Sequence, residues 1–146
     1  MIHWPDMLRL TIAYLLALPM AIEREREEQS AGLRTFPLMA LASCAGILIS
    51  MRSLDLGGQS RVFQGLLSGI GVICAGAIIH ATTRVHGTAT AAGILATAAM
   101  GSAAAFQMYD VAIFLSAVMY ITLRFSRRFK ERLDRDVSGK TGSDTI

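Results

Sequence analysis

The sequence contains few charged residues for a chain of its size. Of its 146 residues, 17% are charged and 53% are hydrophobic, a balance too apolar for an ordinary soluble domain. The apolar residues form long runs separated by clusters of charge, which is the pattern of helices that cross a bilayer. The composition therefore predicts an all-α fold, a polytopic transmembrane helical bundle made of one unit.

Cysteine is also scarce, and the sequence lacks the groups that most enzymes need. Cys44 and Cys74 each lie within an apolar run, which disfavours a disulfide framework or a thiolate metal site and favours two small buried residues. The segment Met1 to Asp6 lacks the positive start of a signal peptide, so the first apolar run is expected to remain as a span. Because no catalytic set or cofactor fingerprint is present, we expect no enzyme, no cofactor and no nucleic-acid partner.

Five apolar runs are long enough to be helical spans. They are Met7 to Ile22, Phe36 to Met51, Val62 to Ile79, Gly87 to Phe106, and Tyr109 to Phe125. The last two are separated by a connection so short that they must form a tight antiparallel hairpin, unless one of them is re-entrant. We expect Pro19 to kink or loosen the end of the first span and Pro37 to fit the first turn of the second.

The positions of lysine and arginine predict the orientation. With five spans and the N-terminus outside, 11 of the 14 basic residues fall on the inner side and Arg9, Arg52 and Arg61 on the outer side, which favours a cytoplasmic C-terminus. The sequence is therefore divided into a transmembrane domain, 1–125, and a basic cytoplasmic tail, 126–146. The tail begins as a helical extension that favours anionic lipid headgroups, and its last residues, 138–146, are expected to be disordered.

The segment "AIEREREEQSAGLRT", residues 21–35, places six consecutive charges, Glu23 through Glu28, between two apolar runs. Pairs at i,i+3 and i,i+4 support a helical end in which the charges are simply solvated. Glu23 and Arg34, however, stand at the two membrane boundaries of this segment and would need each other if they lay inside the polar boundary. We expect Gly32 to let the chain turn back. A structural and a functional role both remain open here.

Small residues dominate the third and fourth spans. In "GLLSGIGVICAGAII" one helical face carries Gly65, Gly69, Val72 and Gly76, and in "HGTATAAGILATAAMGSAAA" the residues Ala89, Gly93, Thr97, Gly101 and Ala105 recur every fourth position. Small residues let helices approach closely in lipid. The two spans are therefore predicted to pack against each other or against copies of themselves.

Metal binding has weak support in the sequence. His80 and His86 flank a short loop that offers no other strong ligand, whereas a transition-metal site usually needs three or four. Asp6, Asp55 and Asp110 fall on the predicted outer side, where three converging carboxylates would suit Mg²⁺. Interfacial histidines and ordinary surface acids explain the same residues, so no metal ligand is assigned.

A set of motifs resembles the MgtC/SapB family of bacterial inner-membrane proteins. These are "AIERE" followed by "AGLRT", then "SGIGVICAGAII", then "VHGTATAAGILATAAMG", and the similarity runs from about Leu15 to Arg124. The family pattern is matched by Glu23, Arg24, Glu25, Gly32, Leu33, Arg34 and Thr35, by Gly69, Gly71 and Gly76, and by Gly87, Thr90, Ala91 and Ala92. The sequence departs from it at Pro19, Cys74, Ala89 and Leu95.

The resemblance implies a membrane protein of about five helices, linked to growth under low magnesium and, in pathogens, to persistence inside phagocytes. Some members resemble inhibitors of the proton-translocating ATP synthase. Longer members carry a C-terminal soluble domain, which this chain is expected to lack, so a role in virulence is in doubt.

Two functions follow. The first is helix association, with a copy of the chain or with another membrane protein such as ATP synthase. Few polar residues lie within the spans, and no carboxylate lies at membrane depth, as an Mg²⁺ pathway would require. The alternative is an oligomeric channel or transporter for Mg²⁺ or another cation, gated at Glu23, Glu25 and Arg34, with Pro19 breaking the helix.

Overall fold

Five helices make up the described part of the chain. The computed structural model describes residues 4–26, 32–79 and 87–141, with side chains described no further than Phe125. The helices are α1 Trp4–Arg26, α2 Thr35–Ser53, α3 Leu56–Ile79, α4 Thr88–Ala105 and α5 Tyr109–Thr141. The predicted fold class, an all-α membrane bundle, is confirmed.

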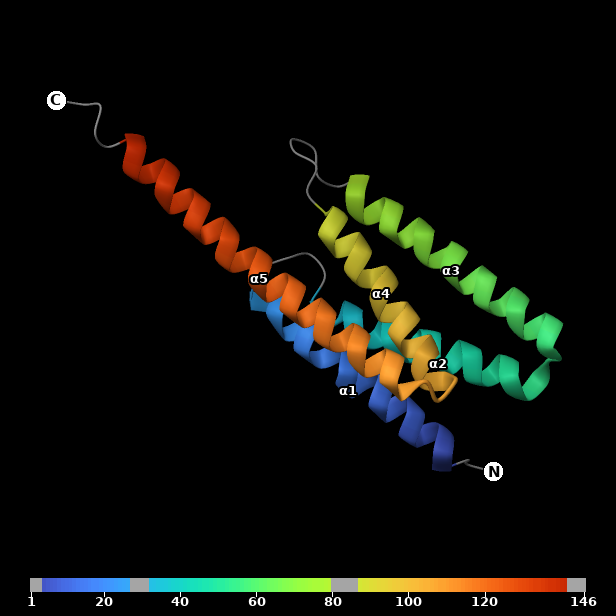
Figure 1. Ribbon diagram of the computed structural model, residues 1–146. Coiled ribbons are helices and arrows are strands. Elements are labelled where there is room, and N and C mark those ends of the chain that lie inside the picture. The colour runs from blue at the N-terminus through green and yellow to red at the C-terminus, as the bar shows by residue number, and fades with distance from the viewer. Residues whose placement is uncertain (1–3, 27–31, 80–86, 142–146) are drawn as a thin grey trace.

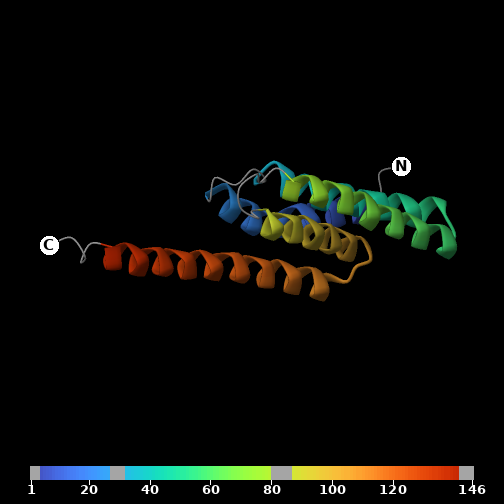
Figure 2. The same ribbon diagram turned by 90° about the horizontal axis from the view of Figure 1, so that it is seen from above.

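Successive helices run in opposite directions, so the two ends of the chain lie at opposite ends of the bundle (Figure 1). The central helix is α4, which contacts each of the other four. Among the described residues α3 touches α2 and α4, and α5 touches α1 and α4. In Figure 2, α5 runs along one side of the other helices and its last part extends beyond them.

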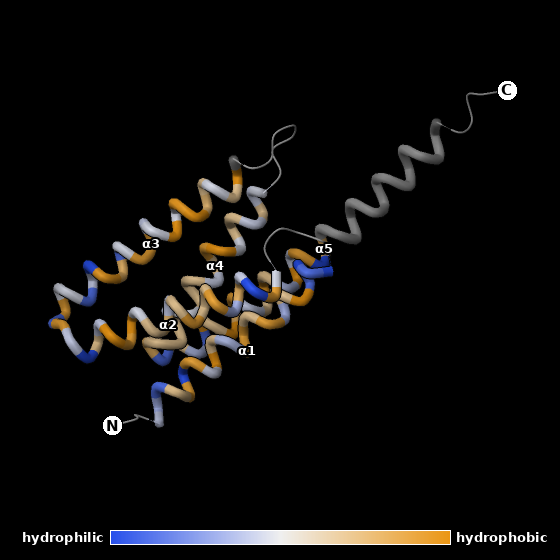
Figure 3. Tube along the Cα trace, turned by 180° about the vertical axis from the view of Figure 1, so that it is seen from behind, coloured by the Kyte–Doolittle hydropathy of each residue, from blue (hydrophilic) through white to orange (hydrophobic). Residues whose placement is uncertain are grey.

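Except for α4, which is slightly shorter, the helices are longer than the predicted spans, because their hydrogen bonding continues past the apolar residues into charged and polar ends. For example, α1 extends to Arg26 and α3 begins at Leu56. By length and composition, α1 to α4 are each able to cross a membrane. The hydropathy of the chain follows this division, with hydrophilic positions near the helix ends and hydrophobic positions between them (Figure 3).

The fourth and fifth helices form an antiparallel hairpin, one of the two predicted arrangements. After Ala105 the chain turns within three residues, and the N–H of Met108 donates to the carbonyl oxygen of Ala103 at 2.9 Å. Gln107 adopts a positive φ of 64°, which reverses the chain direction at some cost for a residue with a side chain. The first part of α5 corresponds to the fifth predicted span, and the helix continues through the predicted boundary at residue 125.

The two prolines of the first half behave differently. Pro37 lies in the first turn of α2 and is buried, as predicted, because this position requires no intrahelical N–H donor. Pro19 lies inside α1, and the helix continues beyond it to Arg26. The charged residues 23 to 26 therefore belong to the last turns of α1.

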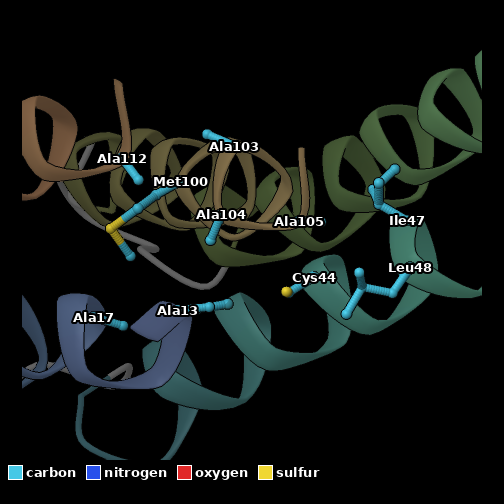
Figure 4. Close-up of a cluster of buried hydrophobic side chains, with 11 residues drawn as sticks. Ala13, Ala17, Cys44, Ile47, Leu48, Met100, Ala103, Ala104, Ala105 and Ala112 are labelled. Carbon is cyan, nitrogen blue, oxygen red and sulfur yellow. The ribbon is translucent and has the colours of Figure 1, made fainter. Parts of the chain in front are cut away.

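The core is made largely of alanine. One cluster joins residues from α1, α2, α4 and α5, among them Ala13, Ala17, Ala40, Cys44, Met100, Ala104 and Ala112 (Figure 4). Small side chains bring the helix backbones close together, so dispersion between them provides the association that the hydrophobic effect supplies in water. Cys44 is buried, as predicted, and Cys74 is half-buried, with its thiol donating to the carbonyl oxygen of Ala91 at 3.2 Å.

Candidate functional site

The charged end of α1 is folded against the bundle. Glu23 and Arg24 are each only 3% exposed, although they belong to the most polar segment of the chain. The Glu23 carboxylate lies 3.9 Å from the guanidinium of Arg26 on the same helix. Arg34 is exposed, and its pairing with Glu23 stays a prediction. The burial of two adjacent ionisable side chains marks this end of the bundle as a candidate site.

Glu25 joins the end of α1 to the start of α2. Its Oε2 accepts a hydrogen bond from the backbone N–H of Leu33 at 3.1 Å. The same oxygen lies where a Cβ of Gly32 would be, so a larger residue at position 32 would have to displace this carboxylate. Gly32 was predicted to supply conformational freedom, but its φ is not among the positive values of the described residues.

The carbonyl oxygen of Gly32 is the first hydrogen-bond acceptor for the backbone of α2. It accepts hydrogen bonds from the N–H of Thr35 at 3.1 Å and of Phe36 at 3.2 Å. Two backbone donors of the first turn are thereby satisfied without a side-chain cap, and Arg34 makes no side-chain capping bond. The predicted motif residues Glu25, Gly32 and Thr35 therefore act as one connected unit.

This unit is anchored to the middle of α4. Phe36 is fully buried, and a Cβ on Gly93 would stand 3.3 Å from its ring and would overlap the methyl of Met20. Thr97 donates to the carbonyl oxygen of Gly93 at 2.8 Å and lies 3.7 Å from the Met20 sulfur. The end of α1 and the start of α2 thus meet on one face of α4.

The small-residue face of α4 is used inside the chain, and α4 contacts α3, as predicted, together with α1 and α2. Gly93, Thr97, Gly101 and Ala105 are buried, but the closest neighbours of Gly93 and Gly101 are Met20 of α1 and Phe36 and Ala40 of α2. The sequence predicted that the two small-residue spans pack against each other or against copies of themselves, and it did not identify α1 and α2 as the helices nearest to these glycines. Spacing identifies a packing face, whereas it carries no information about which helix covers that face.

Two further motif residues, Gly87 and Thr90, lie at the start of α4. Gly87 has a φ of 101°, and a Cβ there would also lie 2.5 Å from the carbonyl oxygen of Ala77 at the end of α3. Both observations require glycine. Thr90, one turn later, is buried. These residues fix how α4 begins beside the end of α3.

The glycines of α3 face away from the rest of the described structure. A Cβ built on Gly65, Gly69, Gly71 or Gly76 would have no neighbour within 4 Å. Within the described side chains of α3, only Ile70 is buried. The predicted helix-packing face of α3 is therefore uncovered in a single chain.

At the opposite end of the bundle lies a charged cluster that the sequence analysis missed. Arg9 Nη1 donates to the carbonyl oxygen of Ala105 at 3.3 Å and lies 3.6 Å from the Asp6 carboxylate. Arg52 pairs with the same carboxylate. The cluster ties α1 to α2 and to the end of α4. The i,i+3 spacing of Asp6 and Arg9 was the available signal.

The metal alternatives gain no support from this cluster. Asp6 is engaged by two arginines, and among the described residues no three His, Cys, Asp or Glu side chains lie close enough to hold a metal ion. His80 and His86 were considered as metal ligands, but they lie outside the described residues.

Comparison with known proteins identifies relatives of this chain. The MgtC family model matches residues 10–132. The chain is 30% identical over 127 residues to uncharacterized protein slr0014 of Synechocystis, covering 86% of this chain and 54% of that protein. It is 31% identical over 134 residues to the putative magnesium transporter YhiD of Escherichia coli K12, with coverages of 86% and 62%.

A third relative is protein MgtC of Salmonella typhimurium, 35% identical over 101 residues, which cover 69% of this chain and 43% of that protein. The chain thus spans roughly half of the length of these curated relatives. No solved structure matches the chain.

Proposed function

The chain belongs to the MgtC family, and we propose that it is a multi-pass protein of the bacterial inner membrane that acts through helix association. Its partner is a second copy of the chain or another membrane protein, and its physiological setting is adaptation to low magnesium. The distribution of basic residues supports a cytoplasmic location for the end of the bundle that carries Glu23 and Gly32.

The observation that carries this proposal is the uncovered face of α3. Gly65, Gly69 and Gly76 leave the helix backbone open along one side, and Gln64 and Ser68 are exposed beside them. In lipid, such a face allows a second helix to approach closely, and the two polar side chains can form hydrogen bonds with it. The corresponding face of α4 is already occupied by α1 and α2.

The nature of the partner follows from the relatives and from the chemistry of the face. Gln64 and Ser68 each carry donors and acceptors, so two copies of α3 are complementary to each other. The likeness to the MgtC family supports a membrane sector such as that of the proton-translocating ATP synthase as the second partner. The link to magnesium is supported by the name of one relative, a putative magnesium transporter.

The test compares two open glycines, Gly69 on the uncovered face of α3 and Gly46 in α2. Gly69→Leu should weaken self-association of the full chain by at least about tenfold, because the leucine holds the paired backbones apart. Gly46→Leu adds the same side chain at an open glycine of α2, away from the α3 face, and should leave association unchanged. Sedimentation in detergent micelles measures both, and a monomeric parent chain or equal effects of the two variants would contradict the interface.

A second function is favoured by the buried ionisable residues Glu23 and Arg24. Ionisable groups held inside a membrane bundle are typical of ion pathways, and Pro19 lies one turn before them in α1. In this alternative, the chain forms an oligomeric transporter or channel for Mg²⁺ or another cation, with Glu23 and Arg34 at its cytoplasmic mouth.

Flux measurements separate the two functions. Proteoliposomes loaded with a magnesium-sensitive dye should show no uptake if the chain acts through association alone. Uptake that is reduced by both Glu23→Gln and Arg34→Gln would instead support the transporter. Uptake that neither substitution changes would contradict the proposed gate at these two residues.

A further inference from the structure

Pro19 leaves a gap in the backbone hydrogen bonding of α1. A proline has no backbone N–H, so the carbonyl oxygen of Leu15, four residues earlier, loses its intrahelical donor, and the pyrrolidine ring crowds the same carbonyl. The ring of Pro19 is exposed on the outside of the bundle, so it is not enclosed by packing that would hold the helix here. A proline inside a helix is a point at which the helix bends easily.

A hydroxyl of α5 bonds to α1 at the level of this gap. Ser116 is only 8% exposed, and its Oγ donates to the carbonyl oxygen of Leu16 at 2.8 Å. Because Leu16 follows Leu15 directly, the donor that α5 adds lies one residue from the donor that Pro19 removes. Serine hydroxyls of neighbouring helices compensate in this way for prolines in membrane helices.

The inner side of α5 packs beside both parts of α1. Ala112 belongs to the same buried cluster as Ala17, which precedes Pro19. Eleven residues further along α5, Leu123 packs against the cluster that contains Met20, which follows Pro19. The two helices are in direct contact. One continuous helix therefore lies across the break in the other.

The attachment of α5 itself is thin. Among the side chains of α5 that the structure describes, Ala112 and Ser116 are the buried ones. A peripheral element with few buried contacts opens at a lower free-energy cost than the core does. Glu23 and Arg24, both buried, lie within five residues of Pro19 in the part of α1 beyond the break. Opening of α5 would therefore remove support from the charged end of α1.

We propose that the segment of α5 from Ala112 to Leu123 is a reversible strap. When the strap is docked, it holds α1 as one helix across Pro19 and keeps the charged end, residues 23–26, against the bundle. When the strap detaches, this end moves on the proline and its ionisable side chains become accessible to water. The strap is a conformational device separate from self-association, because among the described residues α5 has no contact with α3.

Hydrogen exchange of the full chain in detergent micelles tests the strap. Ser116→Ala should speed the exchange of amides 20–26 by about fivefold or more, because it removes the hydrogen bond that closes the break. Ser116→Thr keeps a hydroxyl and should preserve most of the protection. Ser102→Ala is the matched control, since Ser102 is also buried but donates to Ala98 within its own helix. This control should change the same amides by less than about twofold.

The link to the proline is tested in a second background. Pro19→Ala restores the missing N–H, so Ser116→Ala should then alter the exchange of amides 20–26 by less than about twofold. An equal effect of Ser116→Ala in both backgrounds would overturn the proposal. So would faster exchange spread evenly over α2 and α4, because that result would show a general loss of stability and no local release.

The far end of the strap is tested with two apolar residues of α5. Leu123→Ala removes packing beyond the break and should also speed the exchange of amides 20–26. Ile121→Ala shortens a side chain that is 62% exposed and should leave the exchange unchanged. Equal effects of these two variants would contradict the strap. Sedimentation of the same variants should show unchanged self-association, so failure of the strap is distinguishable from failure of the α3 interface.

Discussion

Gly101 of α4 lies directly against the main chain of Ala40 in α2, and a Cβ at position 101 would overlap the Ala40 carbonyl oxygen and stand 3.0 Å from its Cα. Neither backbone can move without disturbing the alanine core. We expect Gly101→Ala to destabilise the bundle by about 1 to 3 kcal/mol, the usual cost of overpacking. The measurement is reversible unfolding in mixed detergent micelles, followed by circular dichroism.

Gly46 provides the control for this substitution, because a Cβ built there meets nothing within 4 Å and the residue also lies in a helix, α2. Gly46→Ala should be neutral or should stabilise the protein by up to about 1 kcal/mol through helix propensity. If both variants lost the same stability, the close approach of α4 to α2 would be wrong.

The contact between Glu25 and the turn at Gly32 predicts coupling between two substitutions. Gly32→Ala should displace the carboxylate and Glu25→Ala should remove it, so each breaks the hydrogen bond to Leu33 and costs about 1 kcal/mol. Because both remove the same bond, the double variant should cost less than the sum of the two. A double-mutant cycle of unfolding free energies measures this. Strict additivity would show that the bond contributes nothing to stability.

The capping of α4 by Arg9 predicts a cost for losing one guanidinium. Arg9→Met keeps the length of the side chain but leaves the Ala105 carbonyl oxygen without this donor, and it should destabilise the bundle by about 1 to 3 kcal/mol. Arg61, which is exposed on α3 near the same end, is the matched control. Arg61→Met should change stability by less than about 0.5 kcal/mol. Equal unfolding free energies of the two variants would exclude the proposed cap.

The positions of the helices were predicted well from the sequence, because hydropathy determines which segments can cross a bilayer. Long apolar runs bounded by charge indicate where a chain can cross a bilayer, and Pro37 marked the first turn of α2. The exact ends were missed because helical hydrogen bonding continues into residues that are polar but compatible with a helix, as at Arg26 and Leu56.

Side-chain environments were harder to predict. The period of four in α4 identified Gly93 and Gly101 as packing positions, and α4 does contact α3, but the period carries no information that α1 and α2 supply the nearest neighbours of these two glycines. The burial of Glu23 and Arg24 likewise depends on how the end of α1 folds against the bundle, which no local pattern records. The close approach at Gly32 likewise comes from the carboxylate of Glu25, seven residues earlier in the chain.

The central place of α4 constrains the order in which the protein can be assembled during synthesis. Three helices leave the ribosome before α4. Contacts of α2 with α1 and with α3 can form at that stage, whereas the contacts that α4 makes with all three must wait for its insertion. The surface of α4 consists largely of alanine, glycine and threonine, which favour close packing against other helices over contact with lipid. The first three helices therefore gain a large part of their packing only when the fourth arrives, and α5 then completes the bundle against α1 and α4.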